Sequence, residues 1–250
     1  MATAPRRLTF GAHAGEYERA RPAWPEEAAR WLVPEDAKLV VELGAGTGKL
    51  TRAVAALGVR VVAVEPDPRM LAVLQGLGLE GVEGSAESIP FGDSVADGVV
   101  AGSSLHWFEL DRALPEIHRV VKPGGRFAFG WNHRDERHAA IARMGEAVYA
   151  AQARTRGPCW RSRDWPVELT ASALFRDVEH TIFEHVHELP RAALDDHLLS
   201  YSGVARLPEG ERRRVGSEVA QILDSDPSVS DGGILRLPFV VTAYRARRAV

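Results

Sequence analysis

Three observations predict that this chain folds as a doubly wound α/β sheet with a helical cap. Short apolar runs alternate with segments of helical periodicity between residues 25 and 130. A glycine-rich turn joins the first of these runs to the helix after it, and an acidic residue ends the second run. Alternating strands and helices of this length form a parallel sheet that is covered by helices on both faces.

The early strands are short runs of β-branched and other apolar residues, bounded by glycine, proline or charged residues. They are expected at residues 37–43, 61–64, 95–101 and 126–131. The helices between them are expected at residues 47–57, 68–77 and 111–121. Pro68 suits a helix N-terminus, Asp111 is a plausible N-cap, and Pro123-Gly124-Gly125 ends the third helix.

The pattern changes after Trp131, where an amphipathic helix and then a polar loop are expected. The later elements are expected as helices at 136–153, 191–201 and 209–223, a loop at 154–163, and strands at 178–186 and 234–244. Pro238 places the last strand near an edge of the sheet or at a bulge, because proline cannot donate to the hydrogen-bond ladder.

We therefore expect one domain over residues 1–250, with a Rossmann-like, doubly wound and mostly parallel sheet, an antiparallel late strand and a helical cap. The core is expected in residues 35–132, 176–188 and 233–246. The N-terminal segment 1–34 and the cap, residues 136–172 and 191–225, are expected over the site.

The composition is that of an ordinary globular protein and excludes several classes. Hydrophobic residues make up 45% and charged residues 26% of the 250 residues, with a net charge of -3, which argues against a disordered chain, a coiled coil and a general nucleic-acid binder. The single cysteine, Cys159, excludes an internal disulfide and a cysteine-rich metal site. Without an apolar leader or a run of about 18 apolar residues, we expect a soluble, cytoplasmic protein.

The most informative stretch is the glycine turn, Glu42-Leu43-Gly44-Ala45-Gly46-Thr47-Gly48. It follows the first strand, at the crevice where doubly wound sheets bind ligands. Glycines let the backbone turn sharply and let a ligand approach it, and the helix that follows favours an anionic group. Lys49 stands where a dinucleotide fingerprint requires its third glycine, and the spacing is not that of a Walker loop.

Glu65 ends the second strand, 21 residues after Gly44. A carboxylate at this place can accept both hydrogen bonds of a ribose diol, at about 1.5–3 kcal/mol each. The residues therefore predict a nucleoside ligand with a compact charged tail over the glycine turn.

The glycine turn together with Val64-Glu65-Pro66-Asp67 resembles the class I S-adenosylmethionine-dependent methyltransferases. Further segments resemble the small-molecule branch that includes trans-aconitate and ubiquinone-pathway methyltransferases. These are Tyr17–Pro25, Gly84–Phe91, Ser104–Phe108, Leu237–Phe239 and Tyr244-Arg245, so the likeness covers nearly the whole chain. It implies in-line transfer of a methyl group from S-adenosylmethionine to a carbon, oxygen or nitrogen atom of a small molecule, with neither a nucleic acid nor a membrane as partner.

The same resemblance implies a cofactor site. In this site, the glycine turn contacts the methionyl part of the cofactor and Glu65 contacts the ribose. The residues that follow Glu65 contact the adenine. In full, these residues are Glu42, Gly44, Ala45, Gly46, Glu65, Pro66, Met70, Ser85, Ala86 and Glu87, with Ser103 at the methionyl end and Tyr17 and Arg21 closing over the cofactor. Family members often carry Asp at the position of Ser85, where it contacts the adenine amino group. In this chain the resemblance leaves that contact to Glu87. Arg21 is expected near the cofactor carboxylate. The alternative interpretation of Arg21 is that it forms an ion pair at the surface.

Methyl transfer requires alignment of the acceptor atom with the methyl group and sulfur, and removal of a proton from a weak nucleophile. His106, His133, His13 and Tyr17 are candidate bases, and the residues alone do not choose among them. His106 has two alternatives: it orients the acceptor, or it packs the loop after the fourth strand. Aromatic residues of the cap are expected in its core or lining an aromatic substrate pocket: Tyr149, Trp160, Trp165 and Tyr201.

Other functions stay open at this point. A nicotinamide-dependent oxidoreductase is weakened by the missing fingerprint glycine, and a non-catalytic nucleoside-binding module would keep the cofactor site without turnover. The near-neutral charge counts against methylation of nucleic acid or protein. His185 and His187 share a strand face, but no third ligand stands at a matching spacing, so we expect no metal.

Overall fold

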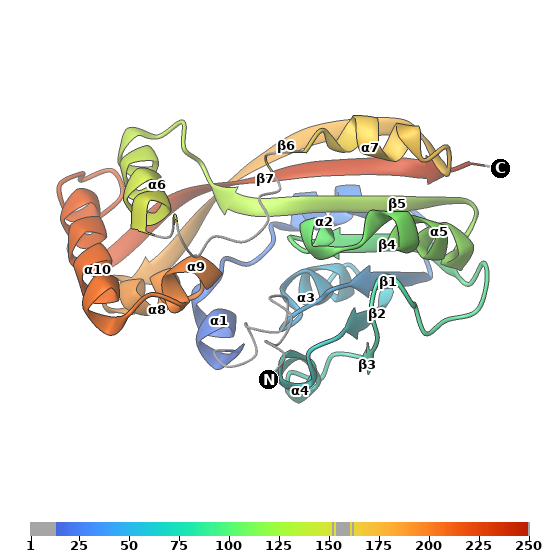
Figure 1. The fold of residues 1–250 in the computed structure, drawn as a ribbon, viewed down its shortest axis with the longest axis horizontal. Helices are drawn as coiled ribbons and strands as arrows, with labels where there is room; N and C mark the ends of the chain where they lie inside the picture. Colours follow the sequence, from blue (N-terminus) through green and yellow to red (C-terminus); the bar gives the residue numbers. More distant parts are fainter. Residues whose placement is uncertain (1–13, 152, 154–160, 162, 250) are drawn as a thin grey trace. The chain divides into compact units, whose positions relative to one another are not determined.

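The computed structural model describes residues 14–151, 153, 161 and 163–249. Within them, the strands form one seven-stranded sheet with the order β3-β2-β1-β4-β5-β7-β6 (Figure 1). In chain order the strands are β1 Leu39–Leu43, β2 Arg60–Glu65, β3 Gly81–Glu83, β4 Ala96–Gly102, β5 Val121–Arg134, β6 Phe175–Pro190 and β7 Ile234–Arg248.

The pairing of strands confirms the expected fold class. β1 lies parallel to β2 and β4, β2 lies parallel to β3, and β4 lies parallel to β5. The arrow of β7 runs opposite to those of β5 and β6, so the late part of the sheet is antiparallel (Figure 1). The sheet is Rossmann-like and mostly parallel, as the alternation of strands and helices predicts.

Helices connect and follow these strands. The α-helices are α1 Ala14–Ala20, α2 Glu26–Leu32, α3 Lys49–Ala55, α4 Pro68–Gly76, α5 Leu110–Val120, α6 Ala139–Ala151, α7 Trp165–Ala171, α8 Leu194–Leu199, α9 Ser202–Ala205 and α10 Glu209–Asp224. Among the described residues, Leu105–Trp107 forms the short 3-10 helix η3 and Arg191–Ala193 forms the short 3-10 helix η5. None of the helices in this described part of the chain is long and apolar enough to cross a membrane.

The chain divides into two compact units. The larger unit comprises Ala23–Asn132, Pro158–Phe183 and Val241–Val250, and the smaller comprises Met1–Pro22, His133–Gly157 and Glu184–Val240. The larger unit therefore holds β1 to β4 with α2 to α5 and α7, and the smaller holds α1, α6 and α8 to α10.

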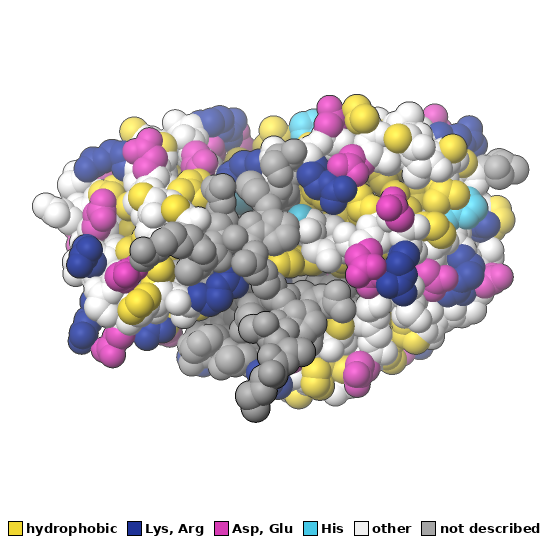
Figure 2. All heavy atoms as spheres, viewed as in Figure 1, with side chains coloured by type: hydrophobic (Ala, Val, Ile, Leu, Met, Phe, Trp, Pro, Cys, Tyr) yellow, Lys and Arg dark blue, Asp and Glu magenta, His cyan; other side chains and the backbone are white. Residues whose placement is uncertain are grey.

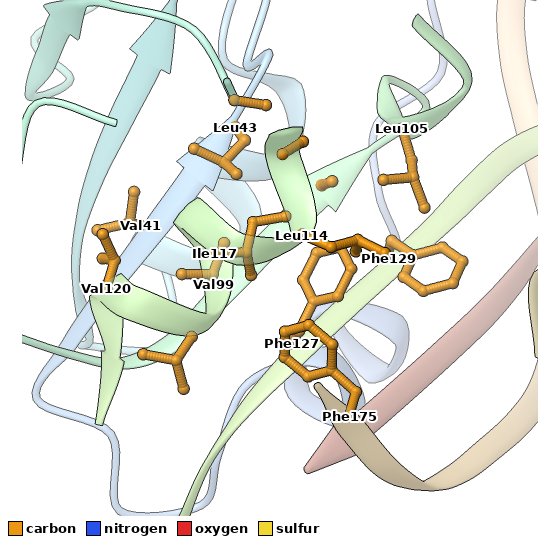
Figure 3. Close-up of a cluster of buried hydrophobic side chains, with 14 of the residues drawn as sticks. Val41, Leu43, Val99, Leu105, Leu114, Ile117, Val120, Phe127, Phe129 and Phe175 are labelled. Atoms are coloured by element: carbon orange, nitrogen blue, oxygen red, sulfur yellow. The ribbon is translucent and has the colours of Figure 1, made fainter. Parts of the chain in front are cut away.

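The larger unit has an apolar core on each face of its strands. Val41, Val99 and Phe127, from β1, β4 and β5, pack with Leu114 and Ile117 of α5 (Figure 3). The neighbouring residues of the same strands face the opposite side of the sheet. There, Val40, Val100 and Ala128 pack with Trp24, Leu32 and Leu50. Successive residues of a strand face opposite sides, so strands covered on both faces need near-continuous apolar sequence.

The smaller unit is built around α6 and α10. Ile141, Met144 and Val148 of α6 are fully buried, which confirms the amphipathic pattern there. They share a cluster with Val219 of α10 and Phe239 of β7.

One expectation about an individual element is wrong. Helix α5 begins at Leu110 after Glu109, so Asp111 lies in the first turn, where its charge suits the helix dipole, and does not cap it. Strand β7 lies between β5 and the edge strand β6, so it lies near an edge of the sheet, as expected from Pro238. The Pro238 carbonyl still accepts a hydrogen bond from the backbone N–H of Asp135 at 3.0 Å.

The structure also differs from the expectation that residues 136–172 belong wholly to the cap. Helix α7 lies in the larger unit, where Trp165 and Leu169 are buried in the main core cluster. The rings of Trp165 and Trp131 have centroids 4.9 Å apart. This long-range aromatic contact decides which unit the helix joins.

Candidate cofactor and active site

The glycine turn lies at the point where the strand order reverses, because β1 has β2 on one side and β4 on the other. Gly44, Gly46 and Gly48 all have positive φ, at 64°, 59° and 88°. A Cβ on Gly44 would lie only 2.8 Å from the Cβ of Ser104, which follows β4. The turn therefore requires glycine at Gly44 for its backbone conformation and for the space.

Glu65 lies against this turn. Its Oε2 accepts a hydrogen bond from the N–H of Gly46 at 2.7 Å, and its Oε1 accepts one from the N–H of Asp67 at 2.9 Å. Burial raises the pKa of Glu65, while these two backbone hydrogen bonds lower it. Each carboxylate oxygen can accept a second hydrogen bond. Glu65 thus holds the turn in place and still offers the acceptors that a ribose diol needs.

Glu42 lies beneath the turn and is 1% exposed. Its Oε2 accepts a hydrogen bond from Thr51 Oγ1 of α3 at 2.6 Å. The pKa of Glu42 is raised to about 8, chiefly by burial and to a smaller extent by the charge of Glu65, although the hydrogen bond from Thr51 lowers it. At neutral pH Glu42 is mainly protonated, and in this structure it joins the end of β1 to α3. Its contact with the cofactor stays a prediction.

This buried carboxyl should make stability depend on pH. An ordinary Glu releases its proton near pH 4.5 and Glu42 does so near pH 8, so the native state binds the proton more tightly than the unfolded state does. The free energy of unfolding should fall by about 3–5 kcal/mol as pH rises from 4.5 to 8. We expect Glu42→Gln, which stays neutral, to remove this decrease in urea unfolding followed by circular dichroism. Glu83→Gln, at the exposed end of β3, should keep it; equal slopes in all three proteins would contradict the assignment.

The residues expected around the adenine follow β2 and β3. Met70 and Ala86 are buried, and Pro66, Ser85 and Glu87 are partly exposed. One Glu87 oxygen accepts a hydrogen bond from the backbone N–H of Glu109 at 3.0 Å. The structure brings these residues to the same unit as the glycine turn, and their contacts with adenine stay predictions.

The segment after β4 is tied to both neighbouring strands. Ser104 Oγ donates to the Leu43 carbonyl of β1 at 2.7 Å. Ser103, with a positive φ of 56°, donates its N–H to the Gly130 carbonyl of β5 at 2.7 Å. These bonds hold the segment that carries Ser103 and His106 beside the glycine turn, as expected from the carboxyl ends of neighbouring parallel strands.

His106 is oriented by a residue that the sequence analysis did not connect with it. The indole N–H of Trp131 donates to Nδ1 of His106 at 3.1 Å. Because indole only donates, Nδ1 must present its lone pair, and the neutral ring carries its proton on Nε2. In this tautomer His106 offers a hydrogen-bond donor at Nε2. The hydrogen bond from Trp131 therefore favours a role for His106 in orienting the acceptor over a role as a general base.

The remaining candidates lie in the smaller unit or outside the described residues. Arg21 and His133 belong to the smaller unit; His133 Nδ1 lies 3.0 Å from the Arg134 carbonyl oxygen, and Arg21 donates to the Ser200 carbonyl at 3.0 Å. His13 and the side chain of Tyr17 lie outside the described residues. Their expected roles stay predictions.

Sequence reasoning missed the role of Asp67 in this region. Asp67 is 1% exposed; its side chain caps α4 by accepting from the Arg69 N–H, and its own N–H fixes Glu65. Asn132 donates from its amide to the Ala23 carbonyl at 2.9 Å. The Asp-Pro pair that opens α4 is a local signal that could have identified the cap at Asp67.

No group of three or more His, Cys, Asp or Glu side chains that could hold a metal ion is found among the described residues. Burial, with a smaller contribution from His187, lowers the pKa of His185 to about 4. Nε2 of His187 lies 3.1 Å from the Ala20 carbonyl oxygen.

Comparison with known proteins extends these observations over the whole chain. Residues 41–129 match the family model of a methyltransferase domain. An uncharacterized methyltransferase of Mycobacterium tuberculosis is 38% identical, covering 97% of this chain and 96% of that protein. The ubiquinone/menaquinone biosynthesis C-methyltransferase of Rubrivivax gelatinosus is 36% identical over 48% of this chain and 46% of its own length. A solved structure from Anaeromyxobacter dehalogenans, assigned to the type II methyltransferases, is 25% identical with a TM-score of 0.67, covering 91% of this chain and 97% of that chain.

Proposed function

The chain belongs to the class I S-adenosylmethionine-dependent methyltransferases, and on that premise we propose that it methylates a small-molecule metabolite at a carbon, oxygen or nitrogen atom. Membership of this family replaces the nicotinamide-dependent alternative. The observation that carries the proposal is the arrangement of Glu65 on the glycine turn, with Glu65 Oε2 2.7 Å from the Gly46 nitrogen. It offers an open main chain for the methionyl group and paired acceptors for the ribose of S-adenosylmethionine.

Two observations support a small molecule as the acceptor. The similar protein of Rubrivivax gelatinosus is a C-methyltransferase of ubiquinone and menaquinone biosynthesis. On the face drawn in Figure 2, basic and acidic side chains are interspersed, and the net charge is -3. A nucleic-acid substrate calls for a concentrated basic surface. The proposal includes the cytoplasm as the compartment of the reaction.

The cofactor supplies a methyl group that is already activated by its bond to a sulfonium. The chain contributes mainly alignment, which is worth about 7–11 kcal/mol in favourable intramolecular cases. We assign His106 to this alignment, as a hydrogen-bond donor to the acceptor through Nε2.

This role for His106 predicts a defined tautomer. In long-range nitrogen-15 NMR of histidine side chains near pH 8, His106 should show its proton on Nε2 and an unprotonated Nδ1. In Trp131→Phe, which removes the indole donor, a mixture of tautomers is expected. His118, whose Nε2 lies 3.1 Å from the Ala249 carbonyl, is an internal reference that should not change. A proton on Nδ1 of wild-type His106 would remove the basis for the donor role.

The acceptor class is tested with S-adenosylmethionine that carries a tritiated methyl group. The protein is incubated with this cofactor and a cell extract, and small molecules are then separated from protein and RNA. We expect the label in the small-molecule fraction. Label in protein or RNA would contradict the proposed acceptor, and cofactor binding without any labelled product would favour the non-catalytic alternative.

A further inference from the structure

Strand β6 is the last strand in the order of the described sheet and has β7 as its neighbour there. An edge strand presents backbone N–H and C=O groups with which another strand can pair, and proteins usually protect such an edge with lysine, proline or a bulge. Between Val178 and Val186 the strand has neither lysine nor proline. Its irregular point, Asp177 with a φ of 53°, lies just before this stretch. We call residues 178–186 the β6 edge segment.

One face of the β6 edge segment carries exposed apolar side chains. Ile182 is 50% exposed and Val186 is 56% exposed. Because side chains alternate between the two faces of a strand, these two residues share a face with Val178, and His180 and Glu184 lie between them. This face is therefore apolar in the middle and at both ends, with one polar side chain on either side of Ile182.

This order of side chains is symmetric about Ile182. When a two-fold axis relates two antiparallel copies of one strand, the residue at the axis lies opposite itself, and residues equally far from the axis lie opposite each other. With the axis at Ile182, Val178 lies opposite Val186 and His180 lies opposite Glu184. Apolar side chains then meet apolar side chains, and the carboxylate meets a histidine.

The other face of the β6 edge segment has the same symmetry. Glu179 lies opposite His185, and Thr181 lies opposite Phe183. The carboxylate on this face therefore also meets a histidine and not another carboxylate. Glu179 already bonds Arg245 of its own chain at 2.6 Å, and its oxygens can accept further hydrogen bonds.

The neighbouring registers lack this match. Moving the axis by one residue in either direction places Ile182 opposite a polar side chain, His180 or Glu184. Cross-strand pairs of matching polarity and opposite charge stabilise an antiparallel pair, and mismatched pairs do not. The sequence of the β6 edge segment is thus complementary to itself in the register that is centred on Ile182.

We propose that two copies of this chain associate by antiparallel pairing of their β6 edge segments, with a two-fold axis at Ile182. A strand of a different protein has to be complementary to the segment, whereas complementarity of the segment to itself is what a two-fold dimer requires. The pairing gives partners to the backbone groups of both edges and covers Ile182 and Val186. It is independent of the proposed methyl transfer.

The mass of the full-length protein in solution tests this interface. In sedimentation velocity over a range of concentrations, wild-type protein should reach twice the monomer mass of 27.3 kDa. Ile182→Lys and Ile182→Glu each place like charges opposite each other at the axis, and each should weaken self-association about tenfold or more. An equimolar mixture of the two variants should restore the dimer, because lysine then lies opposite glutamate.

The matched control is Leu77→Lys, which adds the same charge at another exposed apolar residue. Leu77 is 46% exposed and follows α4, outside β6. This variant should associate as wild-type protein does. Circular dichroism on all variants checks that they are folded.

Disulfide cross-linking tests the register. In a Cys159→Ser background, which removes the natural cysteine, Ile182→Cys should form a disulfide-linked dimer under mild oxidation. Residues directly opposite in an antiparallel pair have Cα atoms about 4.5–5.5 Å apart, within the reach of a disulfide. His180→Cys alone should not link, because its two copies are offset by four residues, about 13 Å along the strands. Mixed with Glu184→Cys, it should link.

Four outcomes would overturn the proposal. Wild-type protein that stays monomeric at every concentration, or Ile182→Lys that associates as well as wild-type protein, would show that β6 does not form the interface. A mixture of Ile182→Lys and Ile182→Glu that stays monomeric would place the axis elsewhere. So would His180→Cys that links to itself as efficiently as Ile182→Cys does.

Discussion

Glu65→Ala is expected to weaken the binding of S-adenosylhomocysteine by about 100-fold or more. The variant loses two hydrogen bonds between the carboxylate and the ribose diol, each worth about 1.5–3 kcal/mol, and 1.4 kcal/mol corresponds to a tenfold change in affinity. It also removes the acceptor that holds the N–H groups of Gly46 and Asp67. The measurement is calorimetric titration of the demethylated cofactor into folded protein.

Glu83→Ala is the matched control for this experiment. Glu83 ends β3, pairs in register with Glu65 and is exposed. Its removal should leave the affinity unchanged within a factor of about two, which is about 0.4 kcal/mol. Equal affinities of wild-type protein and Glu65→Ala would show that the ribose does not lie on this carboxylate.

Gly44→Ala should lower the free energy of unfolding by about 2–5 kcal/mol and abolish measurable cofactor binding. Alanine at a φ of +64° costs about 1–2 kcal/mol, and the overlap of its Cβ with Ser104, at 2.8 Å, adds about 1–3 kcal/mol. The main chain must shift to relieve the overlap, and we propose that this main chain is the surface that contacts the methionyl group. Urea unfolding and cofactor titration measure the two effects.

Alanine substitutions at two further glycines separate the backbone cost from the cost of the steric overlap. Gly46→Ala has a similar φ of +59° but no atom within 4 Å of the added Cβ, so only the backbone cost of about 1–2 kcal/mol is expected. Gly76→Ala, in α4, has neither a positive φ nor a close neighbour, and should be neutral or slightly stabilising. If the three variants lose the same stability, the clash with Ser104 has no effect.

The early strands, their helices and the cofactor turn could be predicted because their signals are local. Apolar periodicity and glycine position are properties of short segments, and β1 with Gly44 to Gly48 has both. Strand β3, only Gly81–Glu83, is too short to show a period. The placement of α7 depends on Trp165 packing against Trp131, which no local pattern contains.

The hydrogen bond between Trp131 and His106 could not be predicted for the same reason. It depends on the register of β4 and β5, where Gly102 lies opposite Gly130. The sequence predicts that the segments after β4 and at the end of β5 lie at one edge of the sheet. It does not predict which of their side chains contact one another.

The hydroxyl of Ser104 joins the end of β1 to the segment that follows β4. It bonds the Leu43 carbonyl just before the glycine turn, and Ser104 stands two residues before His106. A displacement of this serine would therefore move both the residue before the glycine turn and the segment that carries His106. If the cofactor and the acceptor bind at these two places as we propose, their affinities would be linked, and linkage is reciprocal: the factor by which the cofactor raises the affinity for the acceptor equals the factor by which the acceptor raises the affinity for the cofactor.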